Sequence, residues 1–183
     1  MGDGADLAYI IVGGGHARVV TDTLREVGGR IEGYTNPSPI TSLQGGIEYL
    51  GDDDMLSRYS PSDIWLVLGI GSTQSVAKRT HLFVEKRQQG FVFRILAHPS
   101  SIVARDVSMG EGVQVMAGAV VQPGTTLGAN AIVNTNASVG HDCNVGAHVH
   151  IVPGAAVSRD VVLDTGAHVG TGASIIQSIR FGA

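Results

Sequence analysis

This chain contains few of the residues that cross-link a protein, stack in its core or carry charge. Its 183 residues include a single cysteine, Cys143, which excludes an internal disulfide framework and fits a reducing, cytoplasmic setting. Aromatic residues make up 5% and charged residues 15% of the chain, against 43% hydrophobic residues. This composition predicts a globular protein whose interior is lined by small aliphatic side chains.

Two classes of partner are disfavoured by what the chain lacks. The formal net charge is −4, so a nucleic acid held through its phosphates is not expected. The sequence has no secretory signal pattern and no apolar run long enough to cross a bilayer, so no membrane partner is expected.

A six-residue repeat runs from Ser101 to Ala183. One place in each repeat is always apolar, and its register never slips: Val103, Met109, Val115, Val121, Leu127, Val133, Val139, Val145, Ile151, Val157, Leu163, Val169, Ile175 and Phe181. The place two residues earlier is nearly always small or β-branched, and there Cys143 is a buried space-filling residue. A fixed short period marks a solenoid, and neither a helix nor an ordinary strand has a period of six. We therefore predict a parallel β-helix over residues 98–183.

Packing explains why the period is six. Three repeats make a triangular coil of eighteen residues, and each apolar side chain stacks on its equivalent one coil away, at about 4.8 Å. The place after the apolar residue often holds a type that tolerates unusual backbone angles. We expect these residues to form the corners: Gly110, Gly128, Asn134, Gly140, Gly146, Ser158, Asp164 and Gly170.

Residues 9–97 alternate strand and helix patterns, which predicts a small parallel, Rossmann-like α/β domain. The expected strands are 9–12, 30–35, 64–68 and 92–96, with helices after 16, after 52 and over about 74–89; residues 1–8 are expected to be a disordered lead-in. Ligands of such sheets bind beyond the carboxyl ends of the strands. Those ends carry Gly13–His16, Asn36 and Gly69–Ser72.

The glycine turn at 13–15 is suited to holding a phosphate, because its backbone can approach closely and a helix N-terminus follows. A nicotinamide dinucleotide is disfavoured, since Arg18 replaces the third glycine and Asn36 replaces the acidic residue expected on the ribose. No GxxxxGK[ST] motif occurs, which excludes an ATP-hydrolysing loop. Two interpretations remain: a bound nucleotide or nucleotide-sugar, or a tight strand–helix turn without a ligand.

Histidines in the repeat are the candidates for general-base catalysis or metal binding. His141 stands at an outward corner with Asp142 after it, and a carboxylate beside an imidazole can orient the ring as a general base. His150 and His168 are eighteen residues apart, so they share one outer face of the β-helix. A metal site on these histidines is the competing interpretation. Asp142 beside His141 suits base catalysis better, so no metal is expected.

Four segments together resemble a known family. They are GGGHARVV at 13–20, GIGST at 69–73, AHPSSIVARDV at 97–107 and VGHDC at 139–143. This combination is similar to the sialic-acid O-acetyltransferase (NeuD-type) family of sugar acyltransferases, over essentially all of residues 9–180. The resemblance implies a left-handed β-helix, a homotrimer with active sites between neighbouring subunits, and acetyl-CoA as the donor. The implied reaction is N-acetylation of a nucleotide-linked 4-amino-4,6-dideoxyhexose.

Two alternatives stay open at this point. One is O-acetylation of sialic acid or another sugar, and the other is a non-catalytic trimeric module that binds a nucleotide-sugar. Relatives commonly continue with further coils that help to hold CoA, so a chain ending at Ala183 is expected to lack these C-terminal coils.

The resemblance also implies roles for individual residues. His141 is implied to be the general base and Asp142 its acidic partner. His150 is implied to lie near the thioester carbonyl. The residues implied to bind the nucleotide-sugar are Gly14, Gly15, His16, Asn36, Gly71 and Asn134. The residues implied to contact the pantetheine arm of acetyl-CoA are Gly170, Thr171 and Gly172.

Overall fold

The computed structural model describes residues 7–41, 43, 46–72 and 75–182, so most of the expected lead-in lies outside the described residues. The front domain contains β1 (Ala8–Val12), α1 (Ala17–Glu26), β2 (Ile31–Thr35), β3 (Tyr49–Gly51), the 3-10 helix η2 (Asp53–Arg58), β4 (Ile64–Leu68) and α2 (Ala77–Gln88). Its four strands are all parallel, in the order β3-β2-β1-β4. The structure thus confirms the α/β domain that the alternating strand and helix patterns predict.

Several details of this domain differ from expectation: β2 begins at Ile31, one residue late, and β3 is an additional strand. The first strand begins at Ala8, one residue early, and the helix after Asp52 is a 3-10 helix. The predicted start of the last helix at residue 74 lies outside the described residues, and α2 itself begins at Ala77.

The expected strand 92–96 is wrong. Residues 92–94 touch β4 through a single bridge, Leu66 to Phe93. The Phe93 N–H donates to Glu111 Oε1 at 3.0 Å, and the Gly112 N–H donates to the Phe93 carbonyl at 3.1 Å. These bonds turn the chain toward the first coil, so the next strand, β5 (Leu96–Ala97), pairs with the β-helix instead.

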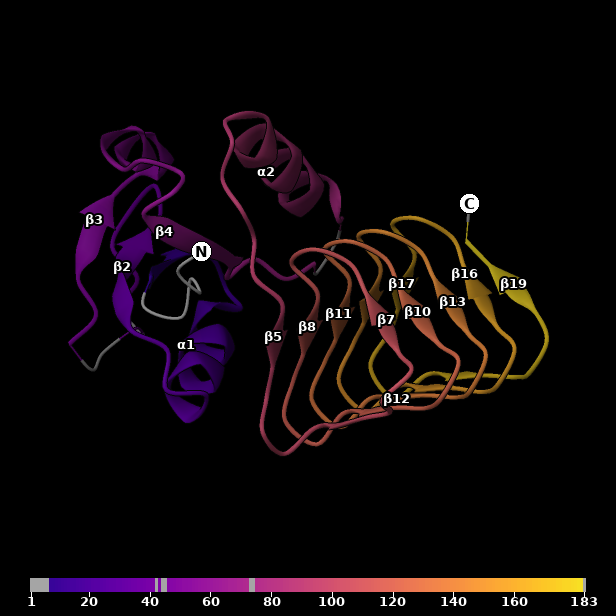
Figure 1. Cartoon of the computed structure of the whole chain (residues 1–183). Helices are drawn as coiled ribbons and strands as arrows, with labels where there is room; N and C mark the ends of the chain where they lie inside the picture. The colour runs from indigo at the N-terminus through magenta and orange to yellow at the C-terminus, as the bar shows by residue number, and fades with distance from the viewer. Residues whose placement is uncertain (1–6, 42, 44–45, 73–74, 183) are drawn as a thin grey trace.

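The rest of the chain is the predicted left-handed parallel β-helix, and the front domain lies at one end of it (Figure 1). We call its three five-stranded sheets the first, second and third sheet. The first holds β5, β8 (Gln114–Val115), β11 (Ile132–Val133), β14 (His150–Ile151) and β17 (His168–Val169). The second holds β6 (Ile102–Val103), β9 (Val120–Val121), β12 (Ser138–Val139), β15 (Ala156–Val157) and β18 (Ser174–Ile175). The third holds β7 (Ser108–Met109), β10 (Thr126–Leu127), β13 (Asn144–Val145), β16 (Val162–Leu163) and β19 (Arg180–Phe181).

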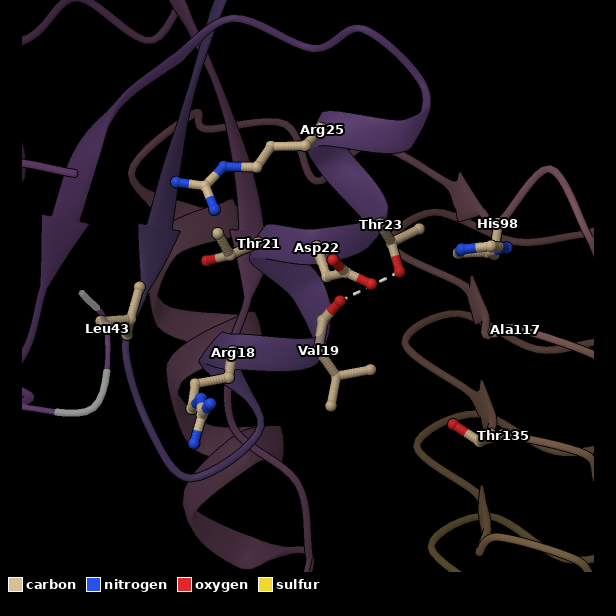
Figure 2. Close-up of a pocket in the computed structure, with 10 residues that line it drawn as sticks. All are labelled: Arg18, Val19, Thr21, Asp22, Thr23, Arg25, Leu43, His98, Ala117 and Thr135. Carbon is tan, nitrogen blue, oxygen red and sulfur yellow. Dashed lines mark hydrogen bonds between the residues drawn. The ribbon is translucent and has the colours of Figure 1, made fainter. Parts of the chain in front are cut away.

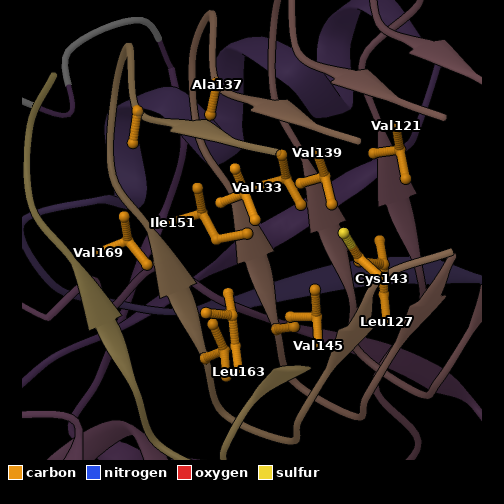
Figure 3. Packing of buried hydrophobic residues seen from close by; sticks show 14 of the residues in the cluster. Val121, Leu127, Val133, Ala137, Val139, Cys143, Val145, Ile151, Leu163 and Val169 are labelled. Atoms are coloured by element: carbon orange, nitrogen blue, oxygen red, sulfur yellow. The ribbon is translucent and has the colours of Figure 1, made fainter. Parts of the chain in front are cut away.

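The register confirms the eighteen-residue coil. Thr126 pairs with Asn144 and Ile132 pairs with His150, as do all other neighbours one coil apart. The apolar places form stacked ladders inside the prism, visible in Figure 3 at Val133, Ile151 and Val169. Burial of each such side chain stabilises the fold by about 1.5–3 kcal/mol. Cys143 lies inside this core as expected, 2% exposed.

The corners are formed differently from the prediction. The left-handed φ angle occurs three places after the apolar residue, where Asn130, Asp142 and His148 have φ near +60° (58°, 59° and 61°). Four of the glycines one place after the apolar residue, Gly110, Gly128, Gly140 and Gly146, are required by close packing instead. A Cβ on Gly128, for example, would lie 2.5 Å from the backbone nitrogen of Ala147 in the next coil.

The front domain covers the first sheet and one corner beside it. The outward side chains of Gln114, Ile132 and His150 on this sheet are almost fully buried. Helix α2 adds Arg79, which is 0% exposed and donates hydrogen bonds to the carbonyls of Asn130 and His148 at the corner between the third and first sheets. The two domains therefore meet through a buried interface.

Candidate active site

The glycine turn after β1 contains glycines of two kinds. A Cβ on Gly13 would lie 2.3 Å from the Thr35 carbonyl oxygen, and one on Gly14 would lie 2.7 Å from Ile70 Cγ1. These two glycines are therefore required by packing against the neighbouring strands. Gly15 has nothing within 4 Å of its Cβ position and is exposed, so it is the glycine that a ligand can approach.

A first cavity, of about 270 Å³, lies at the carboxyl end of the front sheet. Gly14, Gly15 and Asn36 line it together, as the sequence predicts, and Arg18 and Ile40 complete it. The Asn36 amide nitrogen donates to the Ser38 carbonyl at 2.6 Å, so its side-chain oxygen is the end left to accept a hydrogen bond. Arg18 supplies the positive charge beside the turn. In the sequence, this residue stands out only because it replaces the third glycine of a dinucleotide-binding motif.

A second cavity, of about 410 Å³, lies where the two domains meet. It joins residues that the sequence assigns to two different ligands: Gly15, His16, Gly71 and Asn134 with His150. Their meeting follows from the docking of the front domain on the first sheet. Ser72 also lines this cavity and is missing from the sequence-based site. The sequence signals for it are its place in the loop that follows a buried strand and its membership of the GIGST segment at 69–73.

His16 faces the β-helix more than the glycine turn. The Gln114 amide nitrogen donates to the Leu68 carbonyl at 2.7 Å, so Gln114 Oε1 accepts the Nε2–H of His16 at 3.0 Å. Burial lowers the pKa of His16 to about 4, opposed by the Gln114 hydrogen bond and assisted by the charge of Arg79. His16 is thus a neutral donor that ties the two domains together at the edge of the second cavity.

His150 is buried, with both ring nitrogens hydrogen-bonded. Its Nδ1 lies 2.6 Å from Ser72 Oγ and its Nε2 lies 3.0 Å from Asn134 Nδ2. Burial, followed by the charge of Arg79, lowers the pKa of His150 to about 3. The ring of His168 stands edge-on to it at 5.6 Å between centroids, which confirms that these two histidines share a face.

His141 and Asp142 lie at the corner between the second and third sheets, and both are exposed. Their side chains touch: His141 Nδ1 is 2.7 Å from Asp142 Oδ2. The left-handed backbone of Asp142 turns its side chain over Gly124 of the preceding coil. This pair therefore occupies a different edge of the prism from Asn134, which stands at the corner between the first and second sheets.

Gly170, Thr171 and Gly172 stand on the same edge as Asn134, two coils farther along. Gly170 is half-buried, while Thr171 and Gly172 are exposed. Val152 occupies the coil between them and lines the second cavity, so the cavity reaches along this edge to one coil from the glycine corner.

A third cavity, of about 460 Å³, was not predicted and lies between α1 and the β-helix (Figure 2). One face of α1, including Val19 and Thr23, stands opposite His98, Ala117 and Thr135 of successive coils. Thr23 Oγ1 donates to the Val19 carbonyl within the helix. Arg18 lines both this cavity and the first one, so the two adjoin.

Neither a metal cluster nor a membrane span is found in the part of the chain that the structure describes. No three or more His, Cys, Asp or Glu side chains gather there in a metal-binding arrangement. No described helix has the length and apolar character needed to cross a bilayer.

Family models match both domains. The PglD N-terminal domain matches residues 8–82, and the bacterial transferase hexapeptide (six repeats) matches residues 106–141. A search of curated proteins found no match.

Solved structures match nearly the whole chain. The acetyltransferase domain of PglB from Neisseria gonorrhoeae FA1090, in complex with acetyl coenzyme A, is 31% identical, with a TM-score of 0.88 over 97% of this chain and 85% of that one. A histidine-to-asparagine variant of perosamine N-acetyltransferase from Caulobacter crescentus, in complex with CoA and GDP-perosamine, is 30% identical. Its TM-score is 0.80 over 95% of this chain and 90% of that one. WeeI from Acinetobacter baumannii AYE, at 16% identity and a TM-score of 0.70, shares the fold.

Proposed function

This chain belongs to the NeuD-type family of sugar acetyltransferases, and from that membership we propose that it transfers an acetyl group from acetyl-CoA to the amine of a nucleotide-linked 4-amino-4,6-dideoxyhexose. The observation that carries this proposal is the pair of adjoining cavities that share Gly15. A nucleotide diphosphate fits the first cavity beside Arg18, and the sugar then enters the second. The complexes of the similar enzymes with CoA and GDP-perosamine support the same choice of substrates.

His141 is the proposed general base. Asp142 Oδ2 lies 2.7 Å from His141 Nδ1, so the carboxylate accepts the Nδ1–H and leaves Nε2 free to take a proton. The sugar amine attacks the thioester carbonyl carbon while His141 Nε2 accepts an amine proton. The tetrahedral oxyanion then collapses, the C–S bond breaks and CoA leaves as the thiolate. A backbone amide at the donor site would stabilise the oxyanion.

The active site is proposed to be shared between subunits. On one chain His141 stands at the corner between the second and third sheets, whereas the cavity with Asn134 opens at another edge and beneath the front domain. A homotrimer of parallel β-helices brings the His141 corner of one subunit toward the cavity of its neighbour. Acetyl-CoA would then lie along the edge that carries Gly170, Thr171 and Gly172.

The test is turnover by His141→Asn. CoA release with UDP-, GDP- and dTDP-linked 4-amino sugars should fall by about 10²–10⁴-fold, because general-base catalysis contributes that much. Acetyl-CoA affinity by calorimetry and the melting temperature should not change, since His141 is exposed. His81→Asn, at an exposed histidine of α2, is the matched control. Wild-type turnover by His141→Asn would remove His141 from the mechanism.

The acceptor atom is tested with paired sugars. The amine of the 4-amino sugar should be acetylated, while the matching 4-hydroxy sugar nucleotide and free sialic acid should give no CoA release. Release with the hydroxyl compounds alone would contradict N-acetylation and favour an O-acetyltransferase.

A further inference from the structure

Three buried side chains form a hydrogen-bonded chain across the junction of the two domains. Ser72 lies in the loop after β4 of the front domain, His150 on β14, and Asn134 at the corner after β11. Their exposed fractions are 5%, 4% and 7%. All three line the second cavity, so this chain forms part of its wall.

The orientation of the Asn134 amide follows from its neighbour in sequence. Asn134 Oδ1 accepts the backbone N–H of Thr135 at 2.8 Å. The amide nitrogen is therefore the end that faces His150 Nε2 at 3.0 Å. An amide NH₂ can only donate, so Nε2 of His150 must be the unprotonated nitrogen that accepts.

The tautomer of His150 follows in turn. With Nε2 accepting, the neutral ring carries its proton on Nδ1 and donates it to Ser72 Oγ at 2.6 Å. The Ser72 hydroxyl can direct its own proton toward His168 Nδ1 at 3.4 Å. Ser72 is thus the acceptor that stabilises this tautomer, and it reaches His150 only because the front domain docks on the first sheet.

The second N–H of the Asn134 amide has no partner among the described residues. Asn134 itself lines the cavity proposed for the sugar. If the ring of His150 turned or changed tautomer, its Nε2–H would meet the Asn134 NH₂ group, and the amide would have to rotate. The Ser72–His150 contact therefore supports, from the nucleotide-binding domain, the amide direction that the Thr135 N–H sets.

We propose that Ser72 is a positioning residue: by accepting the Nδ1–H it stabilises the His150 tautomer that the Asn134 amide requires, and so helps the Thr135 N–H to keep the free N–H of Asn134 directed at the acceptor sugar. This inference rests on the proposed function for the identity of the sugar. It adds that the loop beyond β4 helps to set the geometry of the acceptor as well as that of the nucleotide.

The substitution that tests the proposal is Ser72→Ala. It removes the acceptor of the Nδ1–H, and a buried N–H without a partner is unfavourable, so the ring should shift toward the Nε2–H tautomer. With a nucleotide-linked amino sugar as the substrate, kcat/KM should fall about tenfold or more. A tenfold fall corresponds to a loss of about 1.4 kcal/mol in transition-state stabilisation. KM for acetyl-CoA should stay unchanged. Ser72→Thr keeps a hydroxyl and should restore both the tautomer and the kinetics.

The tautomer is read by NMR of protein labelled with ¹⁵N-histidine, with the His150 signals assigned from His150→Gln. Wild type and Ser72→Thr should show Nδ1–H, and Ser72→Ala should not. Ser62→Ala, at an exposed serine before β4 on the opposite edge of the sheet, is the matched control and should behave as wild type in both measurements.

The outcomes separate this inference from the proposed function. The NMR reading needs no substrate, so it stands even if wild type shows no acetyl transfer. An Nε2–H tautomer in wild type, or an unchanged tautomer in Ser72→Ala, would overturn the proposal. So would a shifted tautomer with unchanged kcat/KM in an active enzyme, because Ser72 would then have no effect on the acceptor.

Discussion

Two histidines at the domain junction are kept neutral by burial. Burial lowers the pKa of His16 from 6.5 to about 4 and that of His150 to about 3. Between the ordinary and the lowered pKa the unfolded chain binds more protons than the folded one. Stability from these groups is therefore fully present above about pH 6.5 and is lost as the pH falls toward 4 and then 3.

We therefore expect the free energy of unfolding to decrease on acidification. Each histidine should contribute a slope approaching about 1.4 kcal/mol per pH unit within its window. Urea unfolding of wild type and His16→Gln, compared at each pH between about 7 and about 4.5, isolates the contribution of His16. The slope should be smaller in His16→Gln, and equal slopes would contradict a buried neutral His16.

Glycines at the same place of the repeat differ in what they tolerate. Gly128 and Gly170 both follow an inward apolar residue, but a Cβ on Gly128 would lie 2.5 Å from the Ala147 nitrogen, while Gly170 has nothing within 4 Å. Gly128→Ala should lower the free energy of unfolding by about 1–3 kcal/mol, because backbone of the next coil must shift. Gly170→Ala should change it by less than about 0.5 kcal/mol. Urea unfolding of the two variants gives the comparison, and equal losses would contradict the packing explanation.

At the scale of the element, a buried arginine of α2 hydrogen-bonds the backbone of the β-helix. Arg79 donates to the carbonyls of Asn130, His148 and Val149, and burial lowers its pKa to about 10, so it is still charged at neutral pH. Its charge also contributes to the lowered pKa values of His16, His148 and His150. The helix and the histidines of the junction are therefore coupled.

Arg79→Met should release α2 from this corner. The variant leaves buried carbonyls without donors, so we expect a loss of about 2–4 kcal/mol in the free energy of unfolding. Hydrogen exchange should accelerate in α2 more than in the later coils. Arg87→Met is the control: its pair with Glu111 at 2.7 Å involves a side chain that is 53% exposed, so the loss should be below about 1 kcal/mol. Similar losses in both variants would contradict the special role of Arg79.

The two kinds of element differ in how well the sequence predicts them. The repeat places the inward residues of the β-helix correctly from Val103 to Ile175, because each two-residue strand meets its equivalent eighteen residues away, but the last of them, Phe181, is 42% exposed. The predicted strand 92–96 is wrong because the path of these residues depends on Glu111 and Gly112 of the first coil, which hydrogen-bond the Phe93 backbone. A local strand pattern carries no information about such a partner.

At the scale of the whole molecule, the proposed active site needs two chains. His141→Asn and Gly15→Glu each inactivate that shared site, the first through the residue that one subunit supplies and the second through the residue that its neighbour supplies. A Cβ at Gly15 meets nothing within 4 Å, so Gly15→Glu should fold while its carboxylate repels the diphosphate. Each homotrimer should be inactive by itself.

Co-expression of the two variants should recover activity. Mixed trimers then contain sites with an intact His141 from one subunit and an intact Gly15 from its neighbour. CoA release by the co-purified mixture, against a mixture of separately purified trimers, is the measurement. Sedimentation should show one trimeric species in each sample. A mixed trimer with no activity would place both residues in one chain and contradict the shared site.

Only the structure shows that His141 Nδ1 contacts Asp142 Oδ2. The sequence alone determined the β-helix, its period and its inward ladders, because a repeat specifies neighbours that are equivalent and a fixed distance apart. It also placed Gly14, Gly15 and Asn36 at one sheet edge. Only the tertiary structure decided that Ser72, His150 and Asn134 form one chain, because the Ser72–His150 contact spans 78 residues between the two domains and the Asn134–His150 contact spans 16 residues within the β-helix. The docking of the front domain on the β-helix depends on burial of the first sheet and on the contacts of Arg79. Neither can be read from the six-residue repeat.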